Sequence, residues 1–179
     1  ARVASRINAT DVSIFDLDGG DVRLGVWDEG PVDAGHQEFG GRVVVVEGGM
    51  ANSHATHVAG TIASSGAYQP ASKGAATAAR LYSYNFNGSP AAEMAQAVAN
   101  YGIVGSNNSW GFPLGWQWVP GYGWVWYGDD DFGAYTAETA AYDALVKDDG
   151  LFVVFAAGNH RGDFYSGQHY DWTGSDFIS

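Results

Sequence analysis

The sequence predicts an α/β fold in which helices cover a sheet of parallel strands. Strand-like and helix-like stretches alternate along most of the chain, which is the pattern of parallel strands joined by crossover helices. The last strand-like stretch, 151–156, is fully apolar, as expected of a parallel strand covered on both faces. Such sheets bind their ligands at the carboxyl ends of the strands, so functional residues are expected directly after them.

The first half of the chain contains two predicted strands and then a helix. Residues 22–27 form a short, largely apolar strand that ends on Asp28, and a β-branched run follows at 43–46. Ser53 is a suitable N-cap, and apolar residues recur at helical spacing over 54–64. The order strand, strand, helix therefore opens the domain.

The second half continues the alternation. Residues 80–84 are typical of a strand, and the predicted helix over 91–100 follows a serine and a proline that suit its first turn. A further strand begins at residue 103, a helix covers 135–147, and the apolar strand 151–156 comes last. This order of strands and helices predicts an α/β layer with a parallel sheet.

Length, charge and composition exclude several classes of function. The chain has 179 residues, which matches one domain with a hydrophobic core. Its formal net charge of −12 repels phosphate and anionic lipid, so nucleic-acid and membrane-surface partners are not expected. The absence of cysteine excludes disulfides, thiolate metal sites and a cysteine nucleophile. No apolar run approaches the roughly 20 residues of a membrane helix.

Three polar residues stand where an α/β sheet places its chemistry. Asp28 follows the first strand, and His54 lies in the first turn of the first helix, where the helix N-terminus favours the neutral imidazole of a general base. Asn159 follows the last strand, and its amide can donate to a developing oxyanion. Taken alone, Asp28 and Asn159 are better explained as ordinary turn residues, and His54 is a modest signal.

Four motifs in sequence order resemble those of the subtilisin-like serine proteases. They are Asp28-Glu-Gly30, His54-Ala-Thr-His-Val-Ala-Gly60, Ser109-Trp-Gly111 and Ala156-Ala-Gly-Asn159. The resemblance implies a three-layer, parallel-sheet subtilisin-like fold that is incomplete in this chain, with residues 1–179 forming the N-terminal portion of the peptidase domain. It also implies a secreted or periplasmic serine endopeptidase that requires no cofactor.

The resemblance assigns the catalytic residues. His54 matches the general base, Asp28 matches the carboxylate that orients the imidazole, and Asn159 matches the side-chain donor of the oxyanion hole. Glu29, directly after Asp28, is a second carboxylate that either raises the pKa of His54 or points into solvent. We expect the second arrangement.

The resemblance also assigns a peptide-binding strand. Ser109, Trp110 and Gly111 match the strand that pairs with the substrate backbone and walls the primary specificity pocket, and Ala157 and Gly158 are further substrate-binding residues. The implied partner is therefore a peptide or protein substrate.

Residues 112–133 follow that strand and are predicted to be a long insertion loop, because Gly, Pro and Trp recur there without a clear period. So short a loop cannot bury all of its tryptophans and tyrosines, which are Trp116, Trp118, Tyr122, Trp124, Trp126 and Tyr127. In one hypothesis the loop walls substrate subsites for aromatic or large apolar side chains, with 129–131 attracting a basic one. In the other it packs against another part of the protein.

The nucleophile of the family is missing from this sequence. That serine lies in a Gly-Thr-Ser motif well after the oxyanion asparagine, and the chain contains no such motif. Three explanations remain open: a processed protease whose remainder stays bound as a second chain, a segment cut from a longer chain, or a non-catalytic peptide-binding relative. We expect the first.

No complete set of metal ligands is apparent. His57 lies three residues after His54 rather than the four of a zinc helix and is expected to pack within the helix. The acidic stretch 16–21 lacks the glycine position and distal glutamate of a calcium loop and is expected to be a solvated turn. The resemblance allows a structural calcium ion, with Glu38 at an acidic ligand position of some family members.

Overall fold

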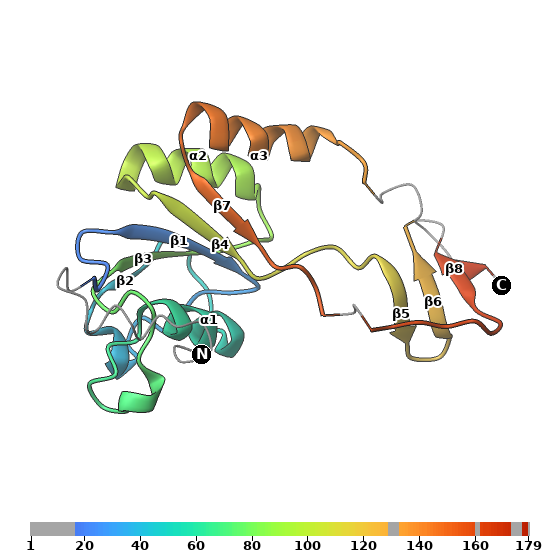
Figure 1. Cartoon of the computed structure of the whole chain (residues 1–179), viewed down its shortest axis with the longest axis horizontal. Helices are drawn as coiled ribbons and strands as arrows, with labels where there is room; N and C mark the ends of the chain where they lie inside the picture. Colours follow the sequence, from blue (N-terminus) through green and yellow to red (C-terminus); the bar gives the residue numbers. More distant parts are fainter. Residues whose placement is uncertain (1–16, 129–132, 160–161, 173–176, 179) are drawn as a thin grey trace.

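A five-stranded parallel sheet forms the centre of the molecule (Figure 1). The structure, a computed structural model, describes residues 17–128, 133–159, 162–172 and 177–178. The strand order is β2-β3-β1-β4-β7, and every neighbouring pair runs parallel. The strands are β1 (Arg23–Asp28), β2 (Val43–Val45), β3 (Arg80–Asn85), β4 (Gly105–Asn108) and β7 (Phe152–Phe155). The predicted parallel α/β fold is confirmed.

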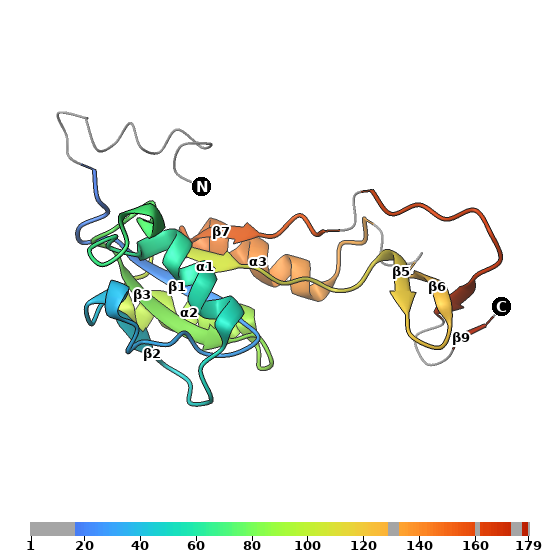
Figure 2. The ribbon, with the colours of Figure 1, turned by 90° about the horizontal axis from the view of Figure 1, so that it is seen from below.

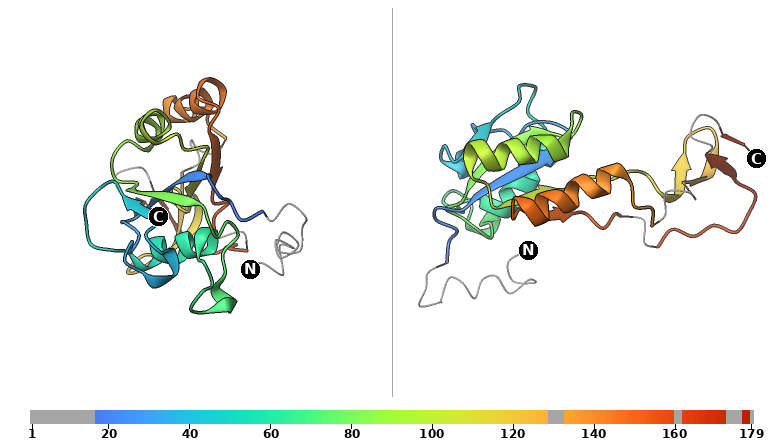
Figure 3. Two further views of the ribbon diagram at one scale, coloured as in Figure 1. Left: turned by 90° about the vertical axis from the view of Figure 1, so that its left-hand side faces the viewer. Right: turned by 90° about the horizontal axis from the view of Figure 1, so that it is seen from above.

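Helices cover the two faces of this sheet unequally. Helix α1 (Ser53–Ala63) lies on one face, and α2 (Pro90–Tyr101) and α3 (Ala137–Asp148) lie together on the other (Figure 3). Two short 3-10 helices, η2 (Gln37–Phe39) and η3 (Pro70–Ser72), flank α1 in sequence. The molecule therefore has the three layers that the family resemblance implies.

Each face has its own core. On the α1 face, Val26 and Leu81 of the sheet pack against Ala55 and Ala59, and all four are fully buried. Burial of a side chain such as Leu81 stabilises the fold by about 1.5–3 kcal/mol. The small residues of α1 let the helix lie close to the strands, which positions the start of the helix beside the end of β1.

Aromatic residues fill the core on the other face. Trp27 is fully buried and stacks on Tyr84 of β3, with ring centroids 4.4 Å apart. Its indole N–H donates to Glu93 of α2 at 2.9 Å. A Cβ at Gly25 would overlap the Trp27 ring, so glycine is needed where that ring crosses the strand. This packing fixes the end of β1, where Asp28 lies.

The prediction of a loop was wrong for the larger part of residues 112–133. Residues 115–127 form an antiparallel hairpin of β5 (Gly115–Val119) and β6 (Gly123–Tyr127), whereas 129–132 lie outside the described residues. With β8 (Tyr170–Trp172) and β9 (Phe177–Ile178) the hairpin builds a second sheet, in the order β5-β6-β8-β9. This sheet stands at one end of the long axis, apart from the first (Figure 2).

Two smaller expectations also differ from the structure. The N-cap of α1 is Asn52, whose side chain accepts from the N–H of Ala55, and Ser53 is the first helical residue. Strand β7 was expected to be buried on both faces, but its side chains are partly open to solvent. It is also an edge strand, since it pairs only with β4 among the described strands. Phe152 is 73% exposed, and Phe155 is exposed as well. An apolar pattern predicts a strand, but it does not show whether other residues pack over both of its faces.

Glu38 holds the loop that follows α1. Its carboxylate accepts from the Ser65 hydroxyl at 2.7 Å and from the backbone N–H groups of Ala67, Tyr68 and Gln69. The Ser65 hydroxyl, assisted by these N–H groups and opposed by burial, lowers the pKa of Glu38 from 4.5 to about 2. The ionised form is therefore part of the folded structure.

Glu38→Gln is expected to destabilise the complete protein near neutral pH and to flatten its stability between pH 5 and 2. Because the pKa is depressed on folding, the carboxylate stabilises the fold above about pH 4.5 and loses this effect as the pH falls toward 2. Urea unfolding across this pH range measures both effects. The exposed control Glu138→Gln should leave the profile unchanged, and equal profiles for the two variants would contradict this role of Glu38.

Candidate active site

Asp28 and His54 are in direct contact. Asp28 ends β1 and is 1% exposed, whereas the His54 side chain, in the first turn of α1, is 54% exposed. His54 Nδ1 lies 2.7 Å from Oδ1 and 2.9 Å from Oδ2 of Asp28. A carboxylate accepts, so Nδ1 carries the proton and donates it to this bond. Nε2 then remains as the basic nitrogen of a partly solvent-accessible ring.

The backbone orients the buried carboxylate. The N–H of Glu29 donates to Asp28 Oδ1 at 2.9 Å, and β1 is hydrogen-bonded on both sides, to β3 and to β4. Burial of a carboxylate is costly unless hydrogen bonds compensate for lost hydration. Here one N–H and one imidazole supply them, which fixes the direction in which Asp28 points.

Asn52 ties the start of α1 to the segment after β1. Its side-chain oxygen caps the helix at the Ala55 N–H, at 2.9 Å, and its backbone N–H donates to the Pro31 carbonyl at 2.8 Å. Its Nδ2 donates to Glu29 Oε1 at 2.8 Å. Glu29 is exposed, as expected, and its carboxylate accepts this hydrogen bond from Asn52. Sequence reasoning missed Asn52, although asparagine before a helix is a recognisable cap.

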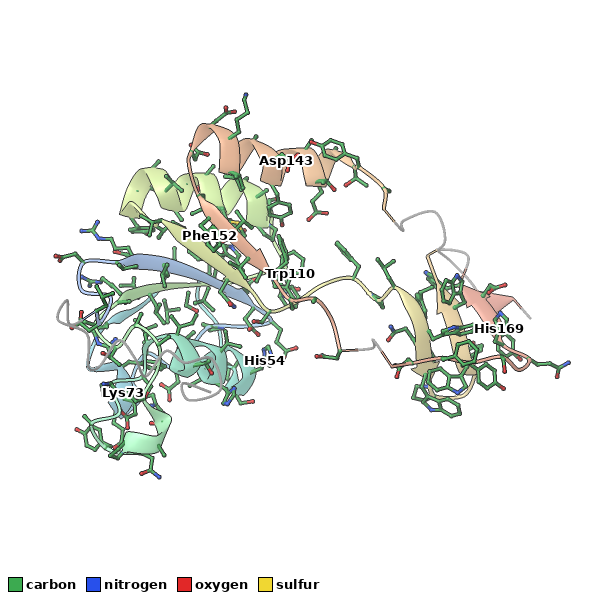
Figure 4. All side chains as sticks on the ribbon, viewed as in Figure 1. His54, Lys73, Trp110, Asp143, Phe152 and His169 are labelled. Atoms are coloured by element: carbon green, nitrogen blue, oxygen red, sulfur yellow. The ribbon has the colours of Figure 1, made fainter. Side chains whose placement is uncertain are left out.

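The peptide-binding segment expected after β4 is held by side chains. Asn107 Nδ2 donates to the Ser109 hydroxyl at 2.9 Å. The Trp110 ring packs between Phe86 and Phe155, with centroids 5.4 Å and 5.3 Å away. Its indole N–H is buried and has no hydrogen-bond partner among the described residues. Figure 4 shows Trp110 near the ends of β4 and β7, above His54.

The residues expected to form the oxyanion turn follow β7. Ala156 donates to the Asn108 carbonyl at 2.9 Å, which continues the β4–β7 pairing one residue past the strand. Ala157, Gly158 and Asn159 are exposed, and Gly158 has a φ of 85°, which favours glycine. No contact between Asn159 and His54 is present among the described residues.

Strand order nevertheless brings the candidate residues to one edge. Asp28 ends β1, Ser109 follows β4 and Asn159 follows β7, and these strands are consecutive in a parallel sheet. Their carboxyl ends therefore meet at the same edge, with the start of α1 beside β1. The structure joins Asp28 to His54 directly and places the remaining candidates on neighbouring strands.

A cavity of about 890 Å³ lies along α1. Its lining includes Asp33, Phe39 and His57 but neither Asp28 nor His54. His57 was expected to pack within the helix; it is exposed instead and faces this cavity. The helix is buried through its alanines, which leaves the polar residues on the cavity side.

Glu38 and the acidic stretch 16–21 were considered as calcium ligands. N–H and O–H donors from the 65–69 loop occupy the carboxylate of Glu38, so a cation would have to displace them. Asp18 accepts from the Gly20 N–H at 2.8 Å, the geometry of the solvated turn that was expected; Asp16 lies outside the described residues. The described part of the chain contains no group of three or more His, Asp or Glu side chains arranged for a metal.

The family model described as the subtilase family, Peptidase S8, matches residues 47–175. The chain belongs to the subtilase family. Members of this family are serine proteases, and this chain shares their fold.

None of the described helices is long and apolar enough to cross a membrane.

Solved subtilase structures share the fold. The patellamide maturation protease PatA is 24% identical, with a TM-score of 0.58 over 80% of this chain and 50% of that chain. A cold-adapted subtilisin-like serine proteinase is 24% identical, with a TM-score of 0.55 over 80% and 49%. MycP1 with its N-terminal propeptide removed is 23% identical, with a TM-score of 0.60 over 94% and 50%.

This subtilase chain thus spans about half the length of the solved structures that it matches. No curated protein sequence matches it significantly.

Asn52→Ala is expected to destabilise the complete protein by about 1 kcal/mol through loss of the helix cap. Asn52→Ser keeps a capping oxygen but loses the bond to Glu29, so it should recover most of the loss. Urea unfolding measures both variants, with the exposed Asn100→Ala as control. A loss for Asn52→Ser as large as for Asn52→Ala would show that the cap is not what holds the start of α1.

Proposed function

We propose that this chain supplies the aspartate, the histidine and the oxyanion asparagine of a serine endopeptidase with an Asp-His-Ser triad. The observation that carries the proposal is the pair of short bonds between the buried Asp28 carboxylate and Nδ1 of the half-exposed His54. This geometry leaves Nε2 free to accept the proton of a nucleophile, which is the role of the base in such a triad.

The nucleophilic serine belongs to a further C-terminal segment, either on a longer chain or on a second chain bound to this one. Support comes from the absence of a Gly-Thr-Ser motif in the sequence and from solved relatives about twice as long as this chain. The exposed edge strand β7, with Phe152 and Val154 open to solvent, is a surface that such a segment would cover.

The proposed reaction passes protons through His54. As the serine oxygen attacks the scissile carbonyl carbon, Nε2 takes the hydroxyl proton, and Asp28 stabilises the resulting imidazolium. The Asn159 amide donates to the carbonyl oxygen as it becomes an oxyanion; loss of such a donor in subtilisin costs about 10²–10³ in turnover. His54 then gives its proton to the leaving amine, and water hydrolyses the acyl-enzyme by the same route.

The substrate is a polypeptide in extended conformation. Its backbone pairs with Ser109–Gly111, and Ala157 and Gly158 form the facing wall. Since β4 and β7 are adjacent, the two walls come from neighbouring strands. The aromatic packing around Trp110 holds the first wall against the body of the sheet.

We further propose that the enzyme acts outside the cytoplasm, in the medium or the periplasm. Many subtilases are secreted, and the net charge of −12 suits an exported protein.

A fluorophosphonate probe applied to the complete protein is expected to label a serine outside residues 1–179, in material recovered from the medium or periplasm. Asp28→Asn should lower the rate of peptide hydrolysis about 10⁴-fold. His54→Ala should abolish labelling, whereas the exposed control Asp148→Asn should change neither quantity. Peptide binding with no labelled serine would instead support a non-catalytic, peptide-binding relative.

A further inference from the structure

Three arginines meet at the amino ends of neighbouring strands. Arg23 begins β1 and Arg80 begins β3, and the two are register partners. Arg42 directly precedes β2, and its carbonyl accepts from the N–H of Leu81 at 2.9 Å. Since β2, β3 and β1 are consecutive in the sheet, the arginines form one row across it, with about 4.8 Å between neighbouring strands. This arginine row lies at the edge of the sheet opposite to Asp28.

The arginine row lines a small cavity of about 280 Å³. Asp21 is the one carboxylate in the lining, so three guanidinium groups face a single negative charge and the formal charge is +2. The whole chain has a net charge of −12 and only eight lysines and arginines. Positive charge is therefore concentrated at this cavity, against the net charge of the protein.

None of the three guanidinium groups forms an ion pair with a carboxylate in the described part of the chain. Arg23 Nη1 donates to the Tyr101 carbonyl at 2.8 Å, at the end of α2. Arg42 donates through both Nη atoms to the carbonyls of Ala79 and Glu38, each at 3.1 Å. These backbone oxygens hold the two side chains in place, but being uncharged they do not neutralise them.

The missing counter-charge has a cost in free energy. Arg42 is half-buried, and burial lowers the pKa of its guanidinium below the usual value, because a charge that leaves water without a counter-ion is destabilised. Arg80 is exposed, and its side chain forms no hydrogen bond or ion pair with the described residues. Like charges on directly opposed residues, here Arg23 and Arg80, also repel each other. An anion bound between the arginines would reduce both penalties.

The size and the donors of the cavity favour a small oxyanion. Its volume of about 280 Å³ is just below the range of pockets that hold drug-sized ligands, about 300–1,000 Å³. Each guanidinium has five N–H donors, so all three arginines retain donors for a ligand. Donors from three strands suit the several oxygens of phosphate or sulfate. The net charge of the protein repels a polyanion or an anionic surface, whereas direct contacts can hold a single small ion.

We propose that Arg23, Arg42 and Arg80 bind a small inorganic oxyanion, phosphate or sulfate, at the amino ends of β1, β2 and β3. The bound ion would hold the three strand starts together and so stabilise the fold. It would take no part in peptide hydrolysis, because β1 separates the arginine row from Asp28 by its full length, roughly 16 Å. The inference goes beyond the proposed function and does not depend on it.

The test is a titration of the complete protein with sodium phosphate near neutral pH. Sodium chloride is adjusted to keep the ionic strength constant, and the heat of binding and the unfolding temperature are both recorded. A bound ion is expected to give a saturable heat and a saturable rise in the unfolding temperature. Exclusion of phosphate from the protein surface also stabilises a fold, but that effect does not saturate.

Four variants separate the site from general effects. Arg80→Gln should weaken phosphate binding about five-fold, the upper range for an exposed ion pair, and Arg80→Lys should recover only part of it. Asp21→Asn removes the one carboxylate of the lining and should tighten binding; asparagine also suits the φ of 65° at this residue. The control Lys147→Gln removes a charge whose side chain is 82% exposed on α3, and it should leave binding unchanged.

Three results would overturn the proposal. The first is a response to phosphate that does not saturate, which is also expected if a carboxylate elsewhere in the complete protein occupies the arginine row. The second is equal binding by Arg80→Gln and Lys147→Gln. The third is sedimentation of the protein with phosphatidic acid vesicles, lost in Arg80→Gln, without any response to inorganic phosphate, since the phosphoryl group would then come from a lipid. None of these results bears on the triad, because no readout depends on turnover.

Discussion

The hydrogen bond between His54 Nδ1 and the buried carboxylate of Asp28 is the interaction on which the site depends. It joins the end of a central strand to the start of a helix on the sheet's face, and it determines which imidazole nitrogen remains basic. The carboxylate can be buried because an N–H and the imidazole replace its hydration, and the imidazole is oriented because the carboxylate is immobile. Neither residue would have this role without the other.

The central strand β1 and the helix α1 hold Asp28 and His54 in position. Strand β1 lies between β3 and β4, so its end cannot shift without disturbing two ladders of hydrogen bonds. The alanines of α1 bring the helix close to the strands, and Asn52 fixes where the helix begins. Small side chains and one cap thus place His54 within hydrogen-bond distance of Asp28.

The sequence was sufficient for the parallel sheet and for the Asp28–His54 pair, because strand ends and helix starts are local signals and the motifs occur in a recognisable order. It was insufficient for the hairpin, where alternating tryptophans among glycines resemble an irregular loop until a partner strand supplies their cross-strand neighbours. It also misjudged His57 and β7, because exposure depends on what the rest of the protein covers. The spacing of apolar and polar residues identifies a helix or a strand, but it does not identify what packs against it.

The protonation state of His54 tests the central claim most directly. In the complete protein at a pH where the ring is neutral, ¹⁵N NMR distinguishes a proton on Nδ1 from one on Nε2. We expect the Nδ1-protonated tautomer, with Nε2 unprotonated, and a shift toward the other tautomer in Asp28→Asn, whose amide can donate to the ring. A neutral His54 that carries its proton on Nε2 in the unaltered protein would show that the Asp28 carboxylate does not orient the ring.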